Sequence, residues 1–297
     1  MAEYFTVGLN LMDNVFNPKD TGDCGLSVIF SDNHLTYCIL DFKRNRFVGL
    51  QQLLKTDVRQ ITSLAGREIS YPDFLESVFD SIPWLAASYR QTRVAWEGSK
   101  STLVPAPLFL PGEKEKYFAF NFGKEGEEEV FCDHLLSMDA YQLFTMPGYI
   151  RNAISRYFQP GTTVHASSIL IASIWVNYKN RIHSPRVFLH LRNSHFDLAI
   201  FDGKQMSYFN TFAFQQPEDV AYYLVFVLEQ LNFNPETLPL VLLGNVSNGD
   251  QLVELLFRYV RHVEFGRRNE TVKYSYMLNQ LQPQAFYTLF NFFSCGL

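Results

Sequence analysis

The stretch LSVIFSDNHLTYCILDFKRNRFVG, residues 26–49, returns in altered form as VFLHLRNSHFDLAIFDGKQMSYFN, residues 187–210. The two stretches align without a gap at an offset of 161 residues (195 − 34), with identities at His34 and His195, Ile39 and Ile200, Asp41 and Asp202, and Lys43 and Lys204. Each copy holds three short apolar segments separated by polar turns, which predicts a meander of three strands. The repeat predicts two related α/β domains that face each other across a cleft, where open α/β sheets bind ligands.

The segments around the two meanders alternate between helical and strand patterns. Apolar spacing predicts strands at 92–96, 130–134, 141–144, 162–165, 238–243 and 262–265. It also predicts helices at 71–82, 113–121 and 147–158, an apolar helix that follows the strand 162–165 and runs to about 180, and helices at 217–231 and 250–261. Pro83 is expected to stop the first of these helices, and Ser167 or Ser168 to cap the fourth. Residues 1–25 are interpreted as a leader with turn signals. The order β-β-β-α-β-α-β after residue 185 predicts a mixed sheet with helices on both faces.

The domain boundary is expected in the short polar stretch 181–185. This gives a first domain at 1–182 and a second at 183–297, with 107–141 as a candidate small inserted subdomain. Residues 124–129 are expected to form an acidic loop.

Composition narrows the class of protein. Of 297 residues, 47% are hydrophobic and 16% aromatic, which is enough for substantial cores. The net charge of −5 argues against a nucleic-acid partner. The four cysteines are scattered and indicate neither a disulfide framework nor a zinc site. No signal peptide is recognised, and the longest tempting uncharged run, 162–178, is short for a span of about 20 residues. We therefore expect a cytoplasmic protein without a transmembrane segment.

The β-β-β-α-β-α-β order, occurring twice, resembles the actin-like ATPase superfamily, which has the ribonuclease H-like fold. This resemblance is carried by the two meander stretches and by the strand–loop–helix LPLVLLGNVSNGDQLVELL (238–256). The stretches RVAWEGSKSTLVPAPLF (93–109) and FNFFSCGL (290–297) also resemble an uncharacterised bacterial family of about this length with that fold. The resemblance covers the chain from about Gly25 to the end. More distant relatives by fold include actin-like pilus-assembly and cell-division proteins. Because the role of the bacterial family is unknown, the resemblance implies a fold and says little about activity.

The resemblance also implies where a nucleotide would bind. In ATP-using members, an Asp-x-Gly turn after the first strand of each domain meets the phosphates and the metal, since a tight turn lets backbone N–H groups approach them. In the turn 31–34, Asp32 stands near the expected carboxylate, but the glycine is missing. The turn 192–195 has neither the carboxylate nor the glycine. The adenosine-side loop, 243–249, is the best preserved, although without the phosphate loops a generic turn between a strand and a helix is the favoured interpretation. The candidate nucleotide-binding residues are Asp32, Asn33, Asn193, Ser194, Gly244, Asn245 and Ser247, with ATP and Mg as the implied cofactor.

Other chemistry finds little support. A nuclease of this fold needs several carboxylates around two metals, yet 26–30 has no acid, and Asp32 and Glu97 are more typical of surface residues at strand ends. The stretch GSKST at 98–102 lacks the spacing of a phosphate loop. Neither a Gly-x-Ser-x-Gly elbow nor a His-Glu-x-x-His motif occurs. The catalytic residues are therefore unknown, and we expect no metal site.

Two groups of ring-bearing side chains have a structural and a functional interpretation. His34 and His195 are equivalent in the repeat and could line the two sides of the cleft, although turn histidines satisfied by backbone are favoured. Tyr222, Tyr223 and Phe226 share one helix and could stack bases, although a place in the core or a domain interface is favoured.

The sequence favours a non-catalytic binding or scaffold protein with degenerate phosphate-binding turns and an unidentified protein partner. The alternative is an ATP-binding protein or weak ATPase that uses the interdomain cleft. A magnesium-dependent nuclease comes third. The altered turns favour the first hypothesis over the second, and the missing acid in the first strand disfavours the third.

Overall fold

The computed structural model describes residues 4–56, 69–123, 129–158 and 163–297. The expected acidic loop lies almost wholly outside these residues. The strands are β1 (Phe5–Met12), β2 (Cys24–Phe30), β3 (His34–Asp41), β4 (Arg46–Lys55), β5 (Gln91–Trp96), β6 (Ser101–Pro105), β7 (Val130–Leu135), β8 (Ala140–Thr145), β9 (Thr163–His165), β10 (Arg186–Leu191), β11 (His195–Asp202), β12 (Gln205–Ala213), β13 (Leu240–Gly244), β14 (Val263–Phe265) and β15 (Lys273–Tyr274). The α-helices are α1 (Tyr71–Ser81), α2 (Lys114–Phe122), α3 (Gly148–Tyr157), α4 (Ala166–Tyr178), α5 (Pro217–Gln230), α6 (Gln251–Tyr259) and α7 (Tyr287–Asn291).

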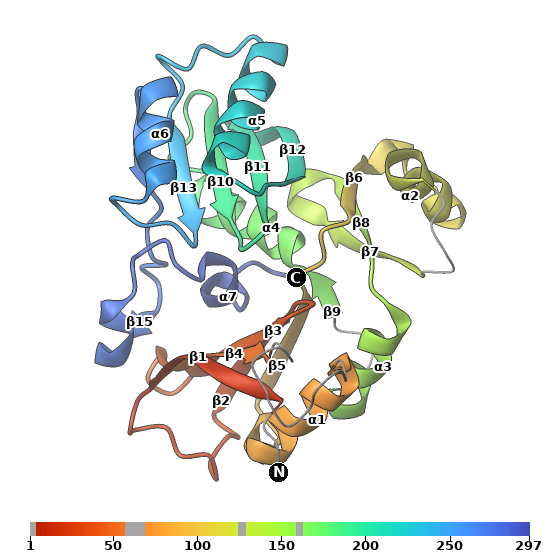
Figure 1. Ribbon diagram of the computed structural model, residues 1–297, viewed down its shortest axis with the longest axis vertical. Helices are drawn as coiled ribbons and strands as arrows, with labels where there is room; N and C mark the ends of the chain where they lie inside the picture. Colours follow the sequence, from red (N-terminus) through yellow and green to blue (C-terminus); the bar gives the residue numbers. More distant parts are fainter. Residues whose placement is uncertain (1–3, 57–68, 124–128, 159–162) are drawn as a thin grey trace.

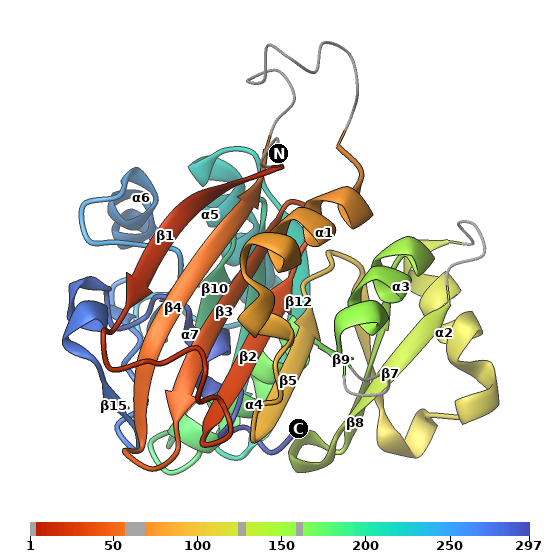
Figure 2. The same ribbon diagram turned by 90° about the horizontal axis from the view of Figure 1, so that it is seen from below.

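The first sheet is built around the meander β2–β3–β4. Its strand order is β1-β4-β3-β2-β5-β9, and β15 also pairs with β4. Figure 2 shows β1, β4, β3, β2 and β5 side by side, with α1 lying across them. Strand β1 corrects the interpretation of residues 1–25 as a leader. Its ends carry the buried side chains Phe5 and Leu11, and it pairs antiparallel with β4 at the edge of the sheet.

The second sheet has the order β12-β11-β10-β13-β14, which matches the order β4-β3-β2-β5-β9 of the first. The pairing register also matches, because Leu26 lies opposite Ile39 and Val187 lies opposite Ile200. The next pair of strands in each sheet shifts register after Ile39 and after Ile200, which are equivalent at the offset of 161 residues. Both predicted meanders are therefore present, with an irregularity at the same point.

Helices form layers on both sides of each sheet, as predicted for a mixed α/β fold (Figure 1). Helices α1 and α3 cover one face of the first sheet, and α5 and α6 cover the outer face of the second. Helices α4 and α7 lie between the two sheets. Ile169 of α4 packs toward the first sheet and Leu170 toward the second, because this helix is apolar on all sides.

Local signals fix several helix ends. Ser70 accepts the N–H of Asp73 at the start of α1, and Pro83 follows its end, as expected. The predicted cap of α4 was wrong. His165 holds the cap position and its side chain accepts the N–H of Ser167, while both candidate serines lie inside the helix.

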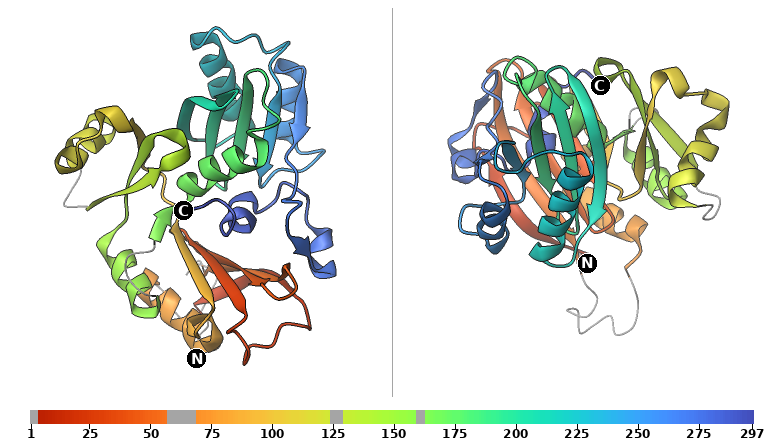
Figure 3. Two further views of the ribbon diagram at one scale, coloured as in Figure 1. Left: turned by 180° about the vertical axis from the view of Figure 1, so that it is seen from behind. Right: turned by 90° about the horizontal axis from the view of Figure 1, so that it is seen from above.

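A separate three-stranded sheet, β6-β8-β7, which carries α2, overlaps the segment 107–141. It has its own small core of Val104, Phe118, Val130 and Leu143. The sheet begins at Ser101 and ends at Thr145, beyond both expected limits. Figure 3 shows it standing to one side of the two larger sheets. Among the described residues, no helix has the length and apolar character needed to span a bilayer.

Candidate functional site

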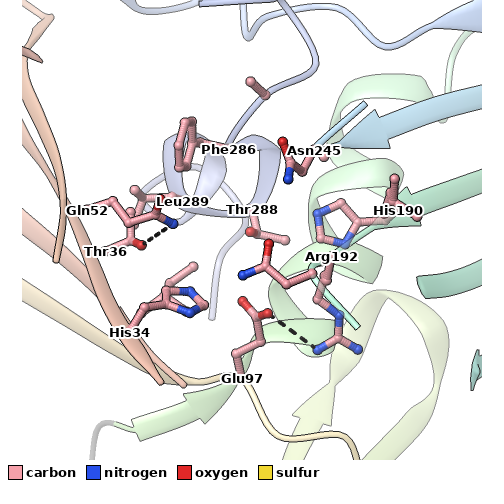
Figure 4. A pocket seen from close by; sticks show the side chains of 15 residues that line it. His34, Thr36, Gln52, Glu97, His190, Arg192, Asn245, Phe286, Thr288 and Leu289 are labelled. Carbon is pink, nitrogen blue, oxygen red and sulfur yellow. Dashed lines mark hydrogen bonds and ion pairs between the residues drawn. The ribbon is translucent and has the colours of Figure 1, made fainter. Parts of the chain in front are cut away.

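A cavity of about 140 Å³ lies between the two large sheets (Figure 4). The first sheet and the residue that follows β5 supply one wall, the second sheet and its turns supply the opposite wall, and the segment around α7 closes a third side. The lining residues are Ile29, His34, Thr36, Gln52, Glu97, His190, Leu191, Arg192, Asn193, Gly244, Asn245, Ala285, Phe286, Thr288 and Leu289.

Three of the seven candidate nucleotide-binding residues reach this cavity: Asn193, Gly244 and Asn245. The other four, Asp32, Asn33, Ser194 and Ser247, are not among its lining residues. Glu97 lines the cavity, whereas Asp32 does not. The two acids that were considered for a metal pair therefore do not meet in this cavity. Within the described ranges, no group of three or more His, Cys, Asp or Glu side chains could hold a metal ion.

The two turns that would meet phosphates have the same backbone hydrogen bond. Ser31 N donates to His34 O at 2.9 Å, and Arg192 N donates to His195 O at 2.9 Å. The side chains differ, because the Ser31 hydroxyl stays within its turn, 2.5 Å from His34 Nδ1. Burial lowers the pKa of His34. His34 lines the cavity and His195 does not, so only one of the equivalent histidines reaches it.

Arg192 links the two halves of the molecule. Its Nη2 lies 2.8 Å from Asp197 Oδ1 within the second sheet. Its Nη1 lies 4.0 Å from Glu97 Oε1 and 3.4 Å from Gly98 O, both just after β5 of the first sheet (Figure 4). The side chain is only 7% exposed. The guanidinium is thus held between two carboxylates, one on each side of the cavity.

The buried carboxylate of Asp197 gathers hydrogen bonds from three further elements. It accepts from Ser167 Oγ of α4 at 3.3 Å and from Thr211 Oγ1 of β12 at 2.7 Å, and His190 Nδ1 lies 3.2 Å from its second oxygen. Burial alone would raise the pKa of Asp197, but the Arg192 charge and these partners hold it well below its usual range. The carboxylate therefore stays ionised inside the protein.

A second buried carboxylate belongs to Asp133 of β7, which lies in space next to the first turn of α4. It accepts the backbone N–H of His165 at 2.8 Å and the hydroxyl of Ser168 at 2.6 Å. Burial raises the pKa of Asp133 to about 6, against the opposing effect of these two bonds. Burial, together with the Arg192 charge, lowers the pKa of the neighbouring His165 to about 3.

Replacing Asp133 by asparagine is expected to alter the pH dependence of stability. The asparagine oxygen keeps both hydrogen bonds but cannot ionise. An acid with a raised folded pKa contributes stability that is present below its unfolded pKa of about 3.9 and is lost as the pH rises through about 6. The free energy of unfolding of the wild type, minus that of Asp133→Asn, should therefore grow by up to about 3 kcal/mol as the pH falls from 7 to 4. Urea titrations across this range measure the difference, and parallel curves would contradict it.

The adenosine-side loop after β13 has its backbone groups engaged within the protein. Gly244 N donates to Gln284 O at 3.0 Å and Asn245 N donates to Leu191 O at 2.9 Å. Ser247 N donates to Asp250 Oδ2 at 2.6 Å. These N–H groups are the donors that a phosphate or base would need.

The backbone conformation and the close packing at position 244 both require a glycine. Its φ of +86° lies in the left-handed region, and an added Cβ would come within 2.2 Å of Leu191 O. The glycine therefore permits the close approach of the loop to β10.

His190, Arg192 and Thr288 also line this site, although no motif in the sequence predicts a role for them. The repeat held a signal for Arg192, since the offset of 161 residues aligns it with Ser31 and aligns Asp197 with Thr36. The second copy thus has an arginine and an aspartate where the first copy has two hydroxyl side chains. This change at both positions indicates an ion pair between Arg192 and Asp197.

Comparisons with known proteins agree with this architecture. The model of a family described as "Protein of unknown function (DUF3822)" matches residues 13–263. No protein in the curated set matches the chain. A solved structure from Bacteroides thetaiotaomicron VPI-5482, described as having an actin-like ATPase fold and unknown function, is 21% identical with a TM-score of 0.73, over 85% of this chain and 94% of that one. A chain of a PilM–PilN type IV pilus biogenesis complex is 12% identical with a TM-score of 0.58, over 89% of this chain and 96% of that one. At these identities the likeness shows the fold alone, which is the actin-like ATPase fold.

Proposed function

The chain belongs to the DUF3822 family of proteins of unknown function, and on that premise we propose that it is a non-catalytic binding or scaffold protein. Its cleft is closed by its own side chains instead of by a nucleotide. The observation that carries this proposal is the bridge from Asp197 through Arg192 to Glu97. The positively charged guanidinium of Arg192 lies between the two carboxylates. Arg192 belongs to the turn at which an ATP-using relative would bind phosphate.

Two further observations support a cleft that holds no nucleotide. The cavity of about 140 Å³ is below the range of about 300 to 1,000 Å³ that is usual for pockets that bind small molecules. Helix α7 fills the space beside it, with Leu289 and Phe290 packed on the first sheet and Tyr287 on the second. A nucleotide would have to displace this apolar layer and also break the hydrogen bonds of the loop after β13.

We also infer that the two halves arose by duplication of one domain, with a first copy at 1–182 and a second at 183–297. The shared strand order, the shared register of the first two strands and the register shift at equivalent residues support this. The segment from Lys273 onward returns to the first sheet, where β15 pairs with β4. The second copy thus contributes its end to the core of the first.

Thermal unfolding with and without millimolar Mg-ATP tests the proposal. A ligand at 100 times its dissociation constant adds about 2.7 kcal/mol to the stability of the native state. For a chain of this size that is a rise of a few degrees in the unfolding midpoint. We expect no rise, because the groups that would hold phosphate are engaged within the protein.

A specific observation favours nucleotide binding as the alternative, because Asn193, Gly244 and Asn245 converge on one cavity. A clear rise in the midpoint with Mg-ATP would support this alternative and overturn the proposal. In that case Asp32→Asn, a change of an exposed side chain, should abolish the metal-dependent part of the rise without unfolding the chain.

A further inference from the structure

An exposed apolar groove runs between α5 and α6, on the outer side of the second sheet. Figure 1 shows both helices on the face directed away from the cleft. The groove has a volume of about 250 Å³, and the apolar side chains that line it are Ala221, Tyr222, Val225, Phe226, Leu255 and Tyr259. It is thus separate from the cavity between the sheets.

Most side chains of the groove are not needed by the core of the second sheet. Helix α5 packs on that sheet through other apolar side chains, namely Val220, Tyr223, Leu224, Val227 and Leu228. Helix α6 likewise packs inward through Leu252, Val253 and Leu256. The aromatic side chains of the groove are therefore left available to another molecule.

The outer stripe of α5 is turned to solvent. Tyr222 is 63% exposed and Phe226 is 45% exposed, and their rings stack one helical turn apart with centroids 6.2 Å from each other. Tyr259 of α6, 49% exposed, faces the same groove. The prediction that Tyr222 and Phe226 belong to the core or a domain interface was therefore wrong. Only Tyr223 packs inward, stacked on Phe212 of β12. Clustered exposed apolar side chains of this kind mark an interaction surface.

Acidic side chains bracket the groove. Glu218 stands one turn before Tyr222, and Glu229 stands one turn after Phe226. They are separated by 11 residues, or about 16 Å along the helix axis. Both are exposed, and neither makes an ion pair with another described residue. The groove is thus apolar along its length and negative at both ends.

We propose that this groove binds an amphipathic helix of a partner protein, about three turns long, with a lysine or arginine near each end. Its apolar side chains, spaced i, i+3 or i+4, and i+7, would lie against Tyr222, Phe226 and Tyr259. Its two basic side chains would lie near Glu218 and Glu229. The inference rests on the proposed function in one respect, that the protein acts by binding another protein.

Apolar contact and charge contribute differently to this complex. The aromatic side chains supply most of the affinity, because tyrosine and phenylalanine bury large areas with few rotatable bonds. The two glutamates lie at the rim in high dielectric, so they mainly select the partner and raise the rate of association. Binding should therefore weaken as salt is added.

A displayed peptide library tests the proposal on the full chain. The library consists of helices of about 14 residues, long enough for three turns and their ends. The apolar stripe is varied among Leu, Ile, Phe and Met, and the two flanking positions are varied among Lys, Gln and Glu. We expect the enriched sequences to carry lysine at both flanks. Enrichment without a preference for lysine, or no enrichment over an unrelated protein, would overturn the proposal.

Variants then locate the binding site of an enriched peptide by fluorescence polarisation. Tyr222→Ala and Phe226→Ala should each weaken binding at least about 10-fold, as expected for anchors at the centre of an interface. Glu218→Gln with Glu229→Gln should weaken it less and remove most of its salt dependence. Phe257→Ala is the matched control, because Phe257 is 51% exposed on α6 but does not line the groove. An equal loss in the control variant would overturn the assignment of the site.

Two outcomes separate this inference from neighbouring hypotheses. If sedimentation shows a dimer of the chain that Tyr222→Ala disrupts, the occupant is a second copy and the proposal of a basic partner helix is wrong. If the selection fails while Mg-ATP leaves the unfolding midpoint unchanged, the groove is excluded and the proposed function of the cleft stands. The melting curves of all variants should match that of the wild type, because each changed side chain is exposed.

Discussion

Replacing Arg192 by alanine is expected to lower the free energy of unfolding by about 3 to 5 kcal/mol. The change removes the main compensating charge of Asp197, whose side chain is only 2% exposed in the wild type. It also removes the link to Glu97 and Gly98 across the cavity. Removing one partner of a buried pair is costly because the other charge stays in a poorly solvating interior. Urea denaturation at pH 7 measures the loss.

A matched control is available at the other end of β10, the strand that Arg192 follows. Arg186 of β10 also pairs with a carboxylate, at 2.5 Å from Glu264, but the two side chains are 24% and 47% exposed. Arg186→Ala should therefore cost less than about 1 kcal/mol. Replacing both members of the buried pair, as Arg192→Met with Asp197→Leu, should recover part of the loss because the buried carboxylate is removed together with its cation. The recovery is incomplete because Glu97 loses its cation and the partners of Asp197 lose their acceptor. A loss below about 1 kcal/mol in Arg192→Ala would contradict the role of the bridge.

The pH dependence of the Arg192→Ala variant gives a second check. In the wild type the pKa of Asp197 is depressed, so its contribution to stability is present above the unfolded pKa and is lost as the pH falls through the folded pKa. Without Arg192, burial dominates and the pKa of Asp197 rises. The variant then binds a proton more readily when folded. The difference in stability between wild type and variant should therefore shrink as the pH is lowered from 7 toward 4.

The sequence was sufficient for much of the fold because its signals are local. The two meanders follow from alternating apolar segments and polar turns, and α1 follows from Ser70, Pro72 and Pro83. Strand β1 was missed because only its two ends, at Phe5 and Leu11, are buried, and the turn signals that follow it dominate the segment. Edge strands bury little, so their patterns are weak.

The site was harder to predict because its contacts join distant parts of the chain. Arg192 and Glu97 are 95 residues apart (192 − 97), and no local periodicity records such a pair. The resemblance located Gly244 and Asn245 by their motif, but it could not show that their N–H groups are already bonded to Leu191 and Gln284. The exposure of Tyr222 could not be predicted either, because it also depends on contacts between segments that are distant in the sequence. Helix α5 is apolar on two faces, and only the packing of α6 decides which face remains open.

Replacing Phe290 by alanine is expected to lower the free energy of unfolding by about 3 to 5 kcal/mol. Phe290 is 5% exposed and packs edge-to-face against Phe47 and Tyr274, with ring centroids 4.9 and 5.2 Å away. Truncation removes these contacts and leaves a cavity that the sheet and α7 cannot fill. Urea denaturation should show a lower midpoint with an unchanged slope, because the surface exposed on unfolding stays nearly the same. Phe120→Ala on α2 is the control, because Phe120 is 90% exposed and should change stability by less than about 0.5 kcal/mol.

The size of the Phe290→Ala loss decides what α7 does in the cleft. If α7 is a permanent layer of the core, destabilising it destabilises the whole molecule, and the variant gains no affinity for Mg-ATP. If α7 instead detaches locally from the two sheets, the free energy of this local opening is well below that of global unfolding. The backbone amides of α7 then exchange hydrogen faster than those of β3. The variant would then lose less than about 1 kcal/mol of global stability and would show a thermal shift with Mg-ATP that the wild type lacks. The apolar contacts of α7 with both sheets favour the first result, because opening the cleft would expose Leu289, Phe290 and Tyr287 together.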